Sequence, residues 1–245
     1  VNTVASADWA FFAKNGSDVT TLAVMTARAH THKKKMFFLK GYYHGDFQWG
    51  QKIDYPGILP EEVANNVVVP WFDLQALEDA YNACDLICFC KALANGYNMS
   101  ALCGGEHMKA TVSGVTYTGS YWMSAIPFAA SIACIDKMKK LNTPKMFREM
   151  GTKLTEGFKA AGKEHGFDLV VTGEPALFYL RIANDDSLML HQEWVSECVS
   201  RGLFLASHHN HFMNAAVTDE DIKKSIEIAE DAFSVVEKNH PELKG

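Results

Sequence analysis

The stretch that decides the fold reads Asp85-Leu-Ile-Cys-Phe-Cys-Lys91-Ala-Leu-Ala-Asn-Gly96. Its short apolar run, Leu86–Cys90, is typical of a buried strand in an α/β protein. Lys91 follows at the carboxyl end of this strand, which is where open α/β sheets bind their ligands. An amine held there among apolar walls or other cations loses its proton more readily and can form a Schiff base. The alternative is a lysine that extends its amine into solvent.

Strands and helices alternate on both sides of this stretch, which predicts an α/β architecture. Ser17 or Asp18 is expected to cap the helix that follows the turn at Asn15. In this half of the chain we expect strands at 9–13, 36–39 and 86–90, a loop at 50–70, and helices at 73–83 and 124–141.

The character of the sequence changes near Asn142, and we place a domain boundary there, between a large domain of residues 1–141 and a small domain of residues 142–245. Thr218 and Asp221 are spaced like a capping box that uses aspartate in place of glutamate. In the small domain we expect helices at 146–165, 191–201 and 218–236, and strands at 169–172, 177–182 and 203–206.

The turn Asn15-Gly16-Ser17-Asp18 opens a helix directly after the first strand. Glycine lets the backbone approach a ligand closely, and free N–H groups at a helix start, together with a serine hydroxyl, suit one phosphate. A simple helix cap is the alternative interpretation.

The loop Gly41-Tyr42-Tyr43-His44-Gly45 lies beyond the second strand. Its aromatic rings and imidazole, set between glycines, could stack on a flat cofactor ring. Tyrosines that only cover the edge of the core would give the same pattern.

Composition narrows the class of protein. The formal net charge of −6 over 245 residues argues against a nucleic-acid-binding protein, which usually presents a basic face. The sequence shows neither an apolar run of transmembrane length nor a leader-like start, and it begins without methionine, so it could start inside a longer protein. We expect a cytoplasmic protein.

Six cysteines are present, and Cys84, Cys88 and Cys90 lie close together. No CxxC pair occurs, which disfavours a zinc site. In a strand, Cys88 and Cys90 point to one face, where we expect small buried side chains with reduced thiols. A cysteine-based redox protein is a weaker alternative.

Two features of the small domain have open interpretations. The run Ser207-His208-His209-Asn210-His211 is rich in imidazole, but neither a carboxylate nor a cysteine lies beside it, so we expect a substrate-facing loop and no metal site. Arg181 ends an apolar strand and could bind a substrate carboxylate through two parallel hydrogen bonds, or serve a purely structural role.

Taken in order, these motifs resemble the class III aminotransferases. Residues 85–96 look like the family's segment around the Schiff-base lysine, and 15–18 like its phosphate turn. Residues 41–45 resemble the loop whose tyrosine, here Tyr43, stacks on the cofactor. The segment Thr118-Gly-Ser-Tyr-Trp-Met-Ser-Ala-Ile-Pro127 resembles the one that supplies a hydroxyl to the phosphate of a neighbouring subunit. The resemblance covers most of residues 9–236.

The resemblance implies fold type I, with a mostly parallel sheet flanked by helices and a smaller C-terminal α+β domain. It implies pyridoxal 5'-phosphate bound through Lys91, which also moves a proton between substrate and cofactor. Small-molecule amine or amino-acid donors, carbonyl acceptors and a homodimer with shared active sites are implied too. The remaining site residues that it implies are Asn15, Gly16, Ser17, Tyr43, His44, Thr118 and Ser120 for the cofactor. Arg181 is the candidate substrate-binding residue because of its place at the end of an apolar strand, not because of the resemblance.

Other readings within the resemblance stay open. An intramolecular aminomutase of the glutamate-1-semialdehyde type would use the same lysine and cofactor. The family also places core strands between the helix at 73–83 and Asp85, including the aspartate that pairs with the pyridine nitrogen. Those strands are not in this sequence, so a catalytically inactive relative is a further alternative. We favour an incomplete sequence, because losing central strands would leave a sheet that cannot bury its faces.

Overall fold

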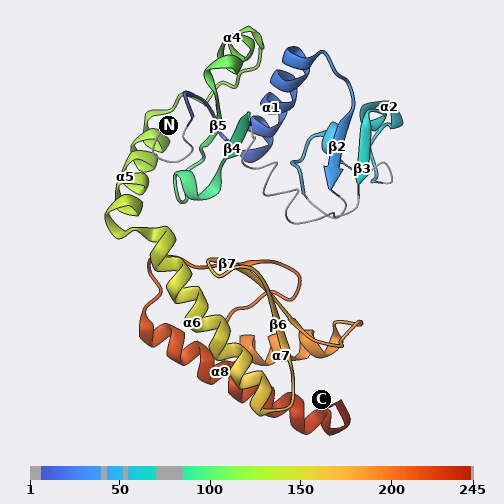
Figure 1. The fold of residues 1–245 in the computed structure, drawn as a ribbon, viewed down its shortest axis with the longest axis vertical. Helices are drawn as coiled ribbons and strands as arrows, with labels where there is room; N and C mark the ends of the chain where they lie inside the picture. Colours follow the sequence, from blue (N-terminus) through green and yellow to red (C-terminus); the bar gives the residue numbers. More distant parts are fainter. Residues whose placement is uncertain (1–6, 40–42, 52–54, 70–84, 244–245) are drawn as a thin grey trace. The chain divides into compact units, whose positions relative to one another are not determined.

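A computed structural model describes residues 7–39, 43–51, 55–69 and 85–243 of the chain (Figure 1). The chain divides into two compact units, Val1–Lys137 and Met138–Gly245. The sequence places its domain boundary at 141/142, at the end of the helix Ala125–Leu141, whereas the division between the units falls inside that helix. The expected helix at 73–83 lies outside the described residues, as do Gly41, Tyr42 and Cys84.

A three-stranded sheet organises the first unit. Its strands are β1 (Trp9–Ala13), β4 (Leu86–Phe89) and β5 (Ser100–Gly104), in the order β1-β5-β4. All of β5 is buried, as expected for a central strand. It runs antiparallel to both neighbours, and the connection at 90–99 is too short for a parallel crossover between β4 and β5. The parallel arrangement expected for most of the sheet does not extend to these two described pairs.

A parallel pair forms the second sheet of this unit. It joins β2 (Met36–Leu39) to β3 (Asn66–Val69). The 3-10 turn η1 (Gln48–Gly50) and the short helix α2 (Pro60–Val63) lie between these strands. The loop expected at 50–70 is thus partly wrong, because the three consecutive valines of β3 have a high strand propensity that the nearby glycine and proline obscured.

Helix α1 (Gly16–Thr31) packs against the three-stranded sheet, and its start is held by a capping box. The Asn15 side chain accepts a hydrogen bond from the Asp18 N–H at 3.0 Å, and the Asp18 carboxylate accepts one from the Asn15 N–H at 3.0 Å. The cap is therefore Asn15, not Ser17 or Asp18 as expected. Val19 and Leu22 of this helix are fully buried in the core of the unit.

Two helices follow β5. The sequence analysis missed α4 (Glu106–Gly114) as well as β5, whereas α5 (Ala125–Leu141) confirms the helix expected at 124–141. The 3-10 turn η2 (Lys91–Leu93) lies between β4 and β5. Helix α5 leaves Ile126 and Ile132 more than half exposed.

The second unit packs three helices against a small antiparallel sheet. The helices are α6 (Thr143–Glu164), α7 (Met189–Ser200) and α8 (Asp219–Asn239), which ends near the 3-10 turn η3 (Pro241–Leu243). The strands β6 (Leu169–Glu174), β7 (Leu177–Ile182) and β8 (His211–Phe212) pair in the order β6-β7-β8. These elements confirm the expected helices and two of the expected strands. The strand expected at 203–206 is wrong, since the third strand is β8.

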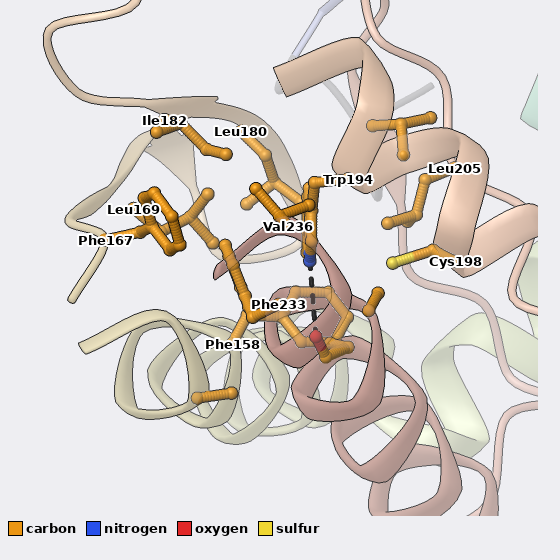
Figure 2. Close-up of a cluster of buried hydrophobic side chains, with 14 of the residues drawn as sticks. Phe158, Phe167, Leu169, Leu180, Ile182, Trp194, Cys198, Leu205, Phe233 and Val236 are labelled. Atoms are coloured by element: carbon orange, nitrogen blue, oxygen red, sulfur yellow. Dashed lines mark hydrogen bonds between the residues drawn. The ribbon is translucent and has the colours of Figure 1, made fainter. Parts of the chain in front are cut away.

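Aromatic rings fill the core of this unit (Figure 2). Trp194 and Phe233 stack with ring centroids 4.8 Å apart, and the Trp194 indole donates a hydrogen bond to the Ala229 carbonyl at 3.3 Å. The α8 capping box between Thr218 and Asp221 is present as expected.

Candidate active site

A cavity of about 540 Å³ lies in the first unit at the carboxyl end of β4. This volume is within the range of about 300–1,000 Å³ that is usual for ligand pockets. Four of the predicted site residues line it, namely Gly16, Tyr43, His44 and Lys91. Further lining residues are Val19, Thr20, Ala23, Val24, Met36, Phe38, Gly45, Trp49, Cys88, Phe89 and Cys90.

Lys91 occupies an unusual backbone conformation. Its φ of 50° is in the left-handed region, which non-glycine residues seldom adopt and which is enriched at functional sites. The extended Cys90 precedes it, and the Lys91 carbonyl accepts a hydrogen bond from the Asn95 N–H at 3.1 Å. The chain therefore turns sharply where β4 ends, and the exposed lysine is placed on the cavity wall.

The start of α1 forms another wall of the cavity through Gly16. The first N–H groups of a helix carry a partial positive charge that favours anions. Ser17 accepts a hydrogen bond from the Asp46 N–H at 2.9 Å, so its hydroxyl ties the following loop to the helix start. Asn15 and Ser17 adjoin this helix start but do not line the cavity itself.

Gly45 fits tightly against the first turn of α1. Its φ is 114°, and a β-carbon there would lie 2.9 Å from the Thr20 hydroxyl oxygen and 3.3 Å from that of Ser17. Only glycine combines this backbone angle with so close an approach. The loop that carries Tyr43 and His44 is thereby anchored to the helix start.

His44 and Tyr43 differ in their environment. The His44 ring packs edge-on against Phe38 with centroids 4.7 Å apart, and its Nε2 is buried without a partner among the described residues. Tyr43 is 69% exposed. An unpartnered polar atom, an amine and a helix start around one cavity fit a ligand that carries an aldehyde, an aromatic ring and a phosphate.

The sequence analysis missed several cavity residues. Cys88 and Cys90 were expected in the core, yet Cys88 is exposed and both side chains line the cavity. The two side chains lie on one side of the strand as predicted, but that side faces the cavity and not the core. Trp49 packs near Phe38 with ring centroids 6.3 Å apart, and its proximity to the predicted aromatic loop was the only signal for it.

Thr118 and Ser120 are exposed and do not line the cavity. They belong to the segment between α4 and α5. Tyr117 and Trp122 anchor this segment through an edge-on ring contact with centroids 5.1 Å apart. Burial, and then the nearby charge of Asp18, raises the pKa of the Tyr117 phenol.

Arg181 lies on β7 in the second unit. Its guanidinium donates hydrogen bonds to the Asp185 carbonyl at 3.0 Å and to the exposed Asp186 carboxylate at 3.2 Å. In the histidine-rich run, His208 and His209 are exposed, whereas His211 belongs to β8. Within the described ranges, no three His, Cys, Asp or Glu side chains converge in a way that could hold a metal ion.

Every helix in the described part of the chain is too short or too polar to span a bilayer.

Comparisons with known proteins point in one direction. No family model matches the chain. The chain is 27% identical over 310 residues to the aminopentol aminotransferase of Sphingopyxis macrogoltabida, an alignment that covers all of this chain and 73% of the relative. It is 24% identical over 312 residues to glutamate-1-semialdehyde 2,1-aminomutase 2 of Bacillus pumilus, covering 89% of this chain and 72% of the relative. The first alignment is longer than the 245 residues of this chain, so that relative carries internal residues that this chain lacks.

Solved structures give the same result. The FumI protein of Sphingopyxis sp., determined with pyridoxal phosphate, superposes with a TM-score of 0.89 at 28% identity, covering 99% of this chain and 74% of that chain. An omega-transaminase from Sphaerobacter thermophilus superposes with a TM-score of 0.83 at 14% identity, covering 96% of this chain and 76% of that chain, and supports the fold alone. Together with the ordered motifs, these likenesses show a fold type I protein that transfers amino groups with pyridoxal phosphate and that is similar to the class III aminotransferases.

Proposed function

We propose that Lys91 binds the cofactor covalently and then moves a proton at the substrate carbon. The observation that carries this proposal is the single cavity shared by Lys91, the start of α1, Tyr43 and His44. Bound pyridoxal phosphate supplies the electron sink for the reaction. The freed Lys91 amine is the group within the cavity that takes the proton as a base and returns it as an acid.

The remaining residues have binding roles in this proposal. The first N–H groups of α1, at Gly16 and Ser17, hold the phosphate, and Asn15 fixes the geometry of that helix start through its capping box. Tyr43 stacks on the ring. The buried Nε2 of His44, which has no partner within the described residues, is a polar atom that would orient the cofactor ring.

We further propose a homodimer in which Thr118 and Ser120 serve the phosphate of the other copy. Both side chains are exposed and lie outside their own cavity, which suits a role toward a neighbour. The exposed Ile126 and Ile132 of α5 offer apolar surface for such a contact. Cys90, Cys103, Cys134 and Cys198 are free thiols, which suits a reducing, cytoplasmic location.

The substrates are a small-molecule amine and a carbonyl compound. An amino alcohol is the first donor to test, because one relative is an aminopentol aminotransferase. Arg181 is the proposed clamp for a carboxylate on the acceptor. The Bacillus pumilus relative favours a second candidate, an intramolecular aminomutase. A transaminase requires two substrates, whereas an aminomutase converts one substrate alone, so turnover with a single purified compound separates them.

The absorbance spectrum of the purified chain tests the role of Lys91. With added pyridoxal phosphate, we expect a visible band that borohydride abolishes, leaving the cofactor on the peptide that contains Lys91. Lys91→Ala should lose both signals, and Lys109→Ala should keep them, because Lys109 is exposed on α4 and pairs with Glu106. A chain that takes up no pyridoxal phosphate, or that carries it on another lysine, would refute the assignment and favour an inactive relative.

A further inference from the structure

The second unit contains a fully buried histidine ring. His191 lies in the first turn of α7 and is 0% exposed. Among the described residues, neither ring nitrogen has a hydrogen-bond partner. Its ring lies 5.8 Å from that of the core residue Trp194. A charged imidazole in this position would be poorly solvated, so the packed state requires the neutral ring.

His191 belongs to a chain of contacts that leads to Arg181. The backbone N–H of His191 donates a hydrogen bond to the Asp185 carboxylate at 2.8 Å, and Asp185 is only 7% exposed. The other oxygen of that carboxylate accepts a hydrogen bond from Ser187 at 2.8 Å, and the Asp185 carbonyl accepts one from Arg181 at 3.0 Å. Asp185 therefore connects the start of α7 to the guanidinium on β7.

A second histidine nearby also depends on being neutral. The Nε2 atom of His211, on β8, accepts a hydrogen bond from the Ala206 N–H at 3.1 Å. Only a neutral imidazole has a lone pair at this atom, so protonation breaks the bond. The His211 ring also stacks on Phe178 of β7, with centroids 5.3 Å apart.

We propose that His191 and His211 form a proton-operated switch in the second unit: charging the rings at mildly acidic pH loosens α7 and the turn at 183–188, and so frees Arg181. The proposed loosening of α7 is argued from the packing alone. Its consequence for substrate binding rests on the proposed role of Arg181.

The direction of the switch follows from the neighbours of each ring. Burial is the main influence that lowers the pKa of His191 below the ordinary value of 6.5; Asp185 opposes it, while His211 and Arg181 add to it. Burial also lowers the pKa of His211, with the Phe178 carbonyl opposing and His209 adding. An opened segment takes up protons near pH 6.5, whereas the packed one does not. Stability is therefore complete above about pH 6.5 and falls as the pH drops below it.

Hydrogen exchange on the full chain, read by mass spectrometry, tests the proposal. After correction for intrinsic exchange, we expect the opening constant of α7 to rise as the pH falls below 6.5, by at most about tenfold per pH unit for each histidine, until the packed rings themselves take up protons. His191→Leu fills the same apolar site and removes no ring hydrogen bond, because neither ring nitrogen has a partner among the described residues, so it should weaken the dependence on pH. His211→Gln, whose amide oxygen can still accept from Ala206, should weaken it too.

Matched controls make the outcome decisive. His165→Gln removes an imidazole of the same unit that pairs with Glu237, and it should leave the exchange response of α7 unchanged. An α7 opening constant that is flat between pH 7.5 and 5, or that still rises in the double variant His191→Leu/His211→Gln, overturns the proposal. If His191→Leu does not fold, direct titration of both rings by NMR decides: rings that titrate at the ordinary histidine pKa overturn it. Neither measurement needs cofactor or turnover, so the result is independent of the proposed function.

Discussion

Replacing Gly45 by alanine should loosen the cofactor cavity without touching a reacting group. The backbone angle alone, a φ of 114°, should cost a non-glycine residue about 1–3 kcal/mol. The new methyl would also lie 2.9 Å from the Thr20 hydroxyl and push the loop away from the start of α1. If the loop lifts away from α1 and this relieves about 2 kcal/mol of the penalty, the same free energy is needed to restore the cavity when the cofactor binds. The affinity for pyridoxal phosphate should then fall by roughly 30-fold.

Gly57→Ala is the matched control. Gly57 has a φ of 89°, and a β-carbon there would meet nothing within 4 Å. It therefore carries the same kind of backbone penalty without the contact with α1. Spectrophotometric titration with pyridoxal phosphate, beside urea unfolding, separates the two effects. Equal cofactor affinities in Gly45→Ala and Gly57→Ala would refute the idea that the loop is anchored to the helix start through Gly45.

Three further predictions follow from single contacts. Asn15→Ala removes the side-chain half of the capping box with Asp18 and should cost about 1 kcal/mol in urea unfolding; an unchanged midpoint would contradict the capping role. Gly151→Ala adds a methyl that overlaps the Pro175 carbonyl, whose carbon would lie only 2.5 Å away. It should therefore destabilise the second unit by about 1–3 kcal/mol, despite the better helix propensity of alanine. An unchanged or higher midpoint of thermal unfolding would argue against this close approach. Burial raises the pKa of Cys198 to about 12, so iodoacetamide at pH 8 should label it only after denaturation; labelling of the native chain at this position would show that the core opens.

Much of the fold could be predicted from the sequence where local pattern and burial agree. The apolar strands at 9–13 and 36–39 and the long amphipathic helices of the second unit are such cases. Strand β5 could not be predicted in this way, because its Ser-Ala-Leu-Cys-Gly sequence lacks the branched side chains typical of strands. Its place in the centre of the sheet comes from pairing with two strands: β1, which is far away in the sequence, and β4, which runs antiparallel to it.

The candidate site divides in a similar way. Lys91 and Gly16 follow predicted strands directly, so the rule for sheet edges places both near one cavity. Periodicity correctly puts Cys88 and Cys90 on one side of a strand, but it does not say whether that side faces core or cavity. The cap at Asn15 was missed although its spacing to Asp18 fits the capping-box pattern. The role of His191 depends on a fully buried environment that the sequence pattern does not reveal.

The left-handed backbone at Lys91 has a consequence for which substitutions this chain could accept during evolution. A lysine at a φ of 50° is less stable there than glycine or asparagine by roughly 1 kcal/mol. Lys91→Gly should therefore unfold at higher urea than Lys91→Ala, even though both lose the amine. Under the role proposed for Lys91, loss of the reaction would make this position one where a substitution can gain stability. The proposed reaction, and not the fold, would then be what keeps a lysine there.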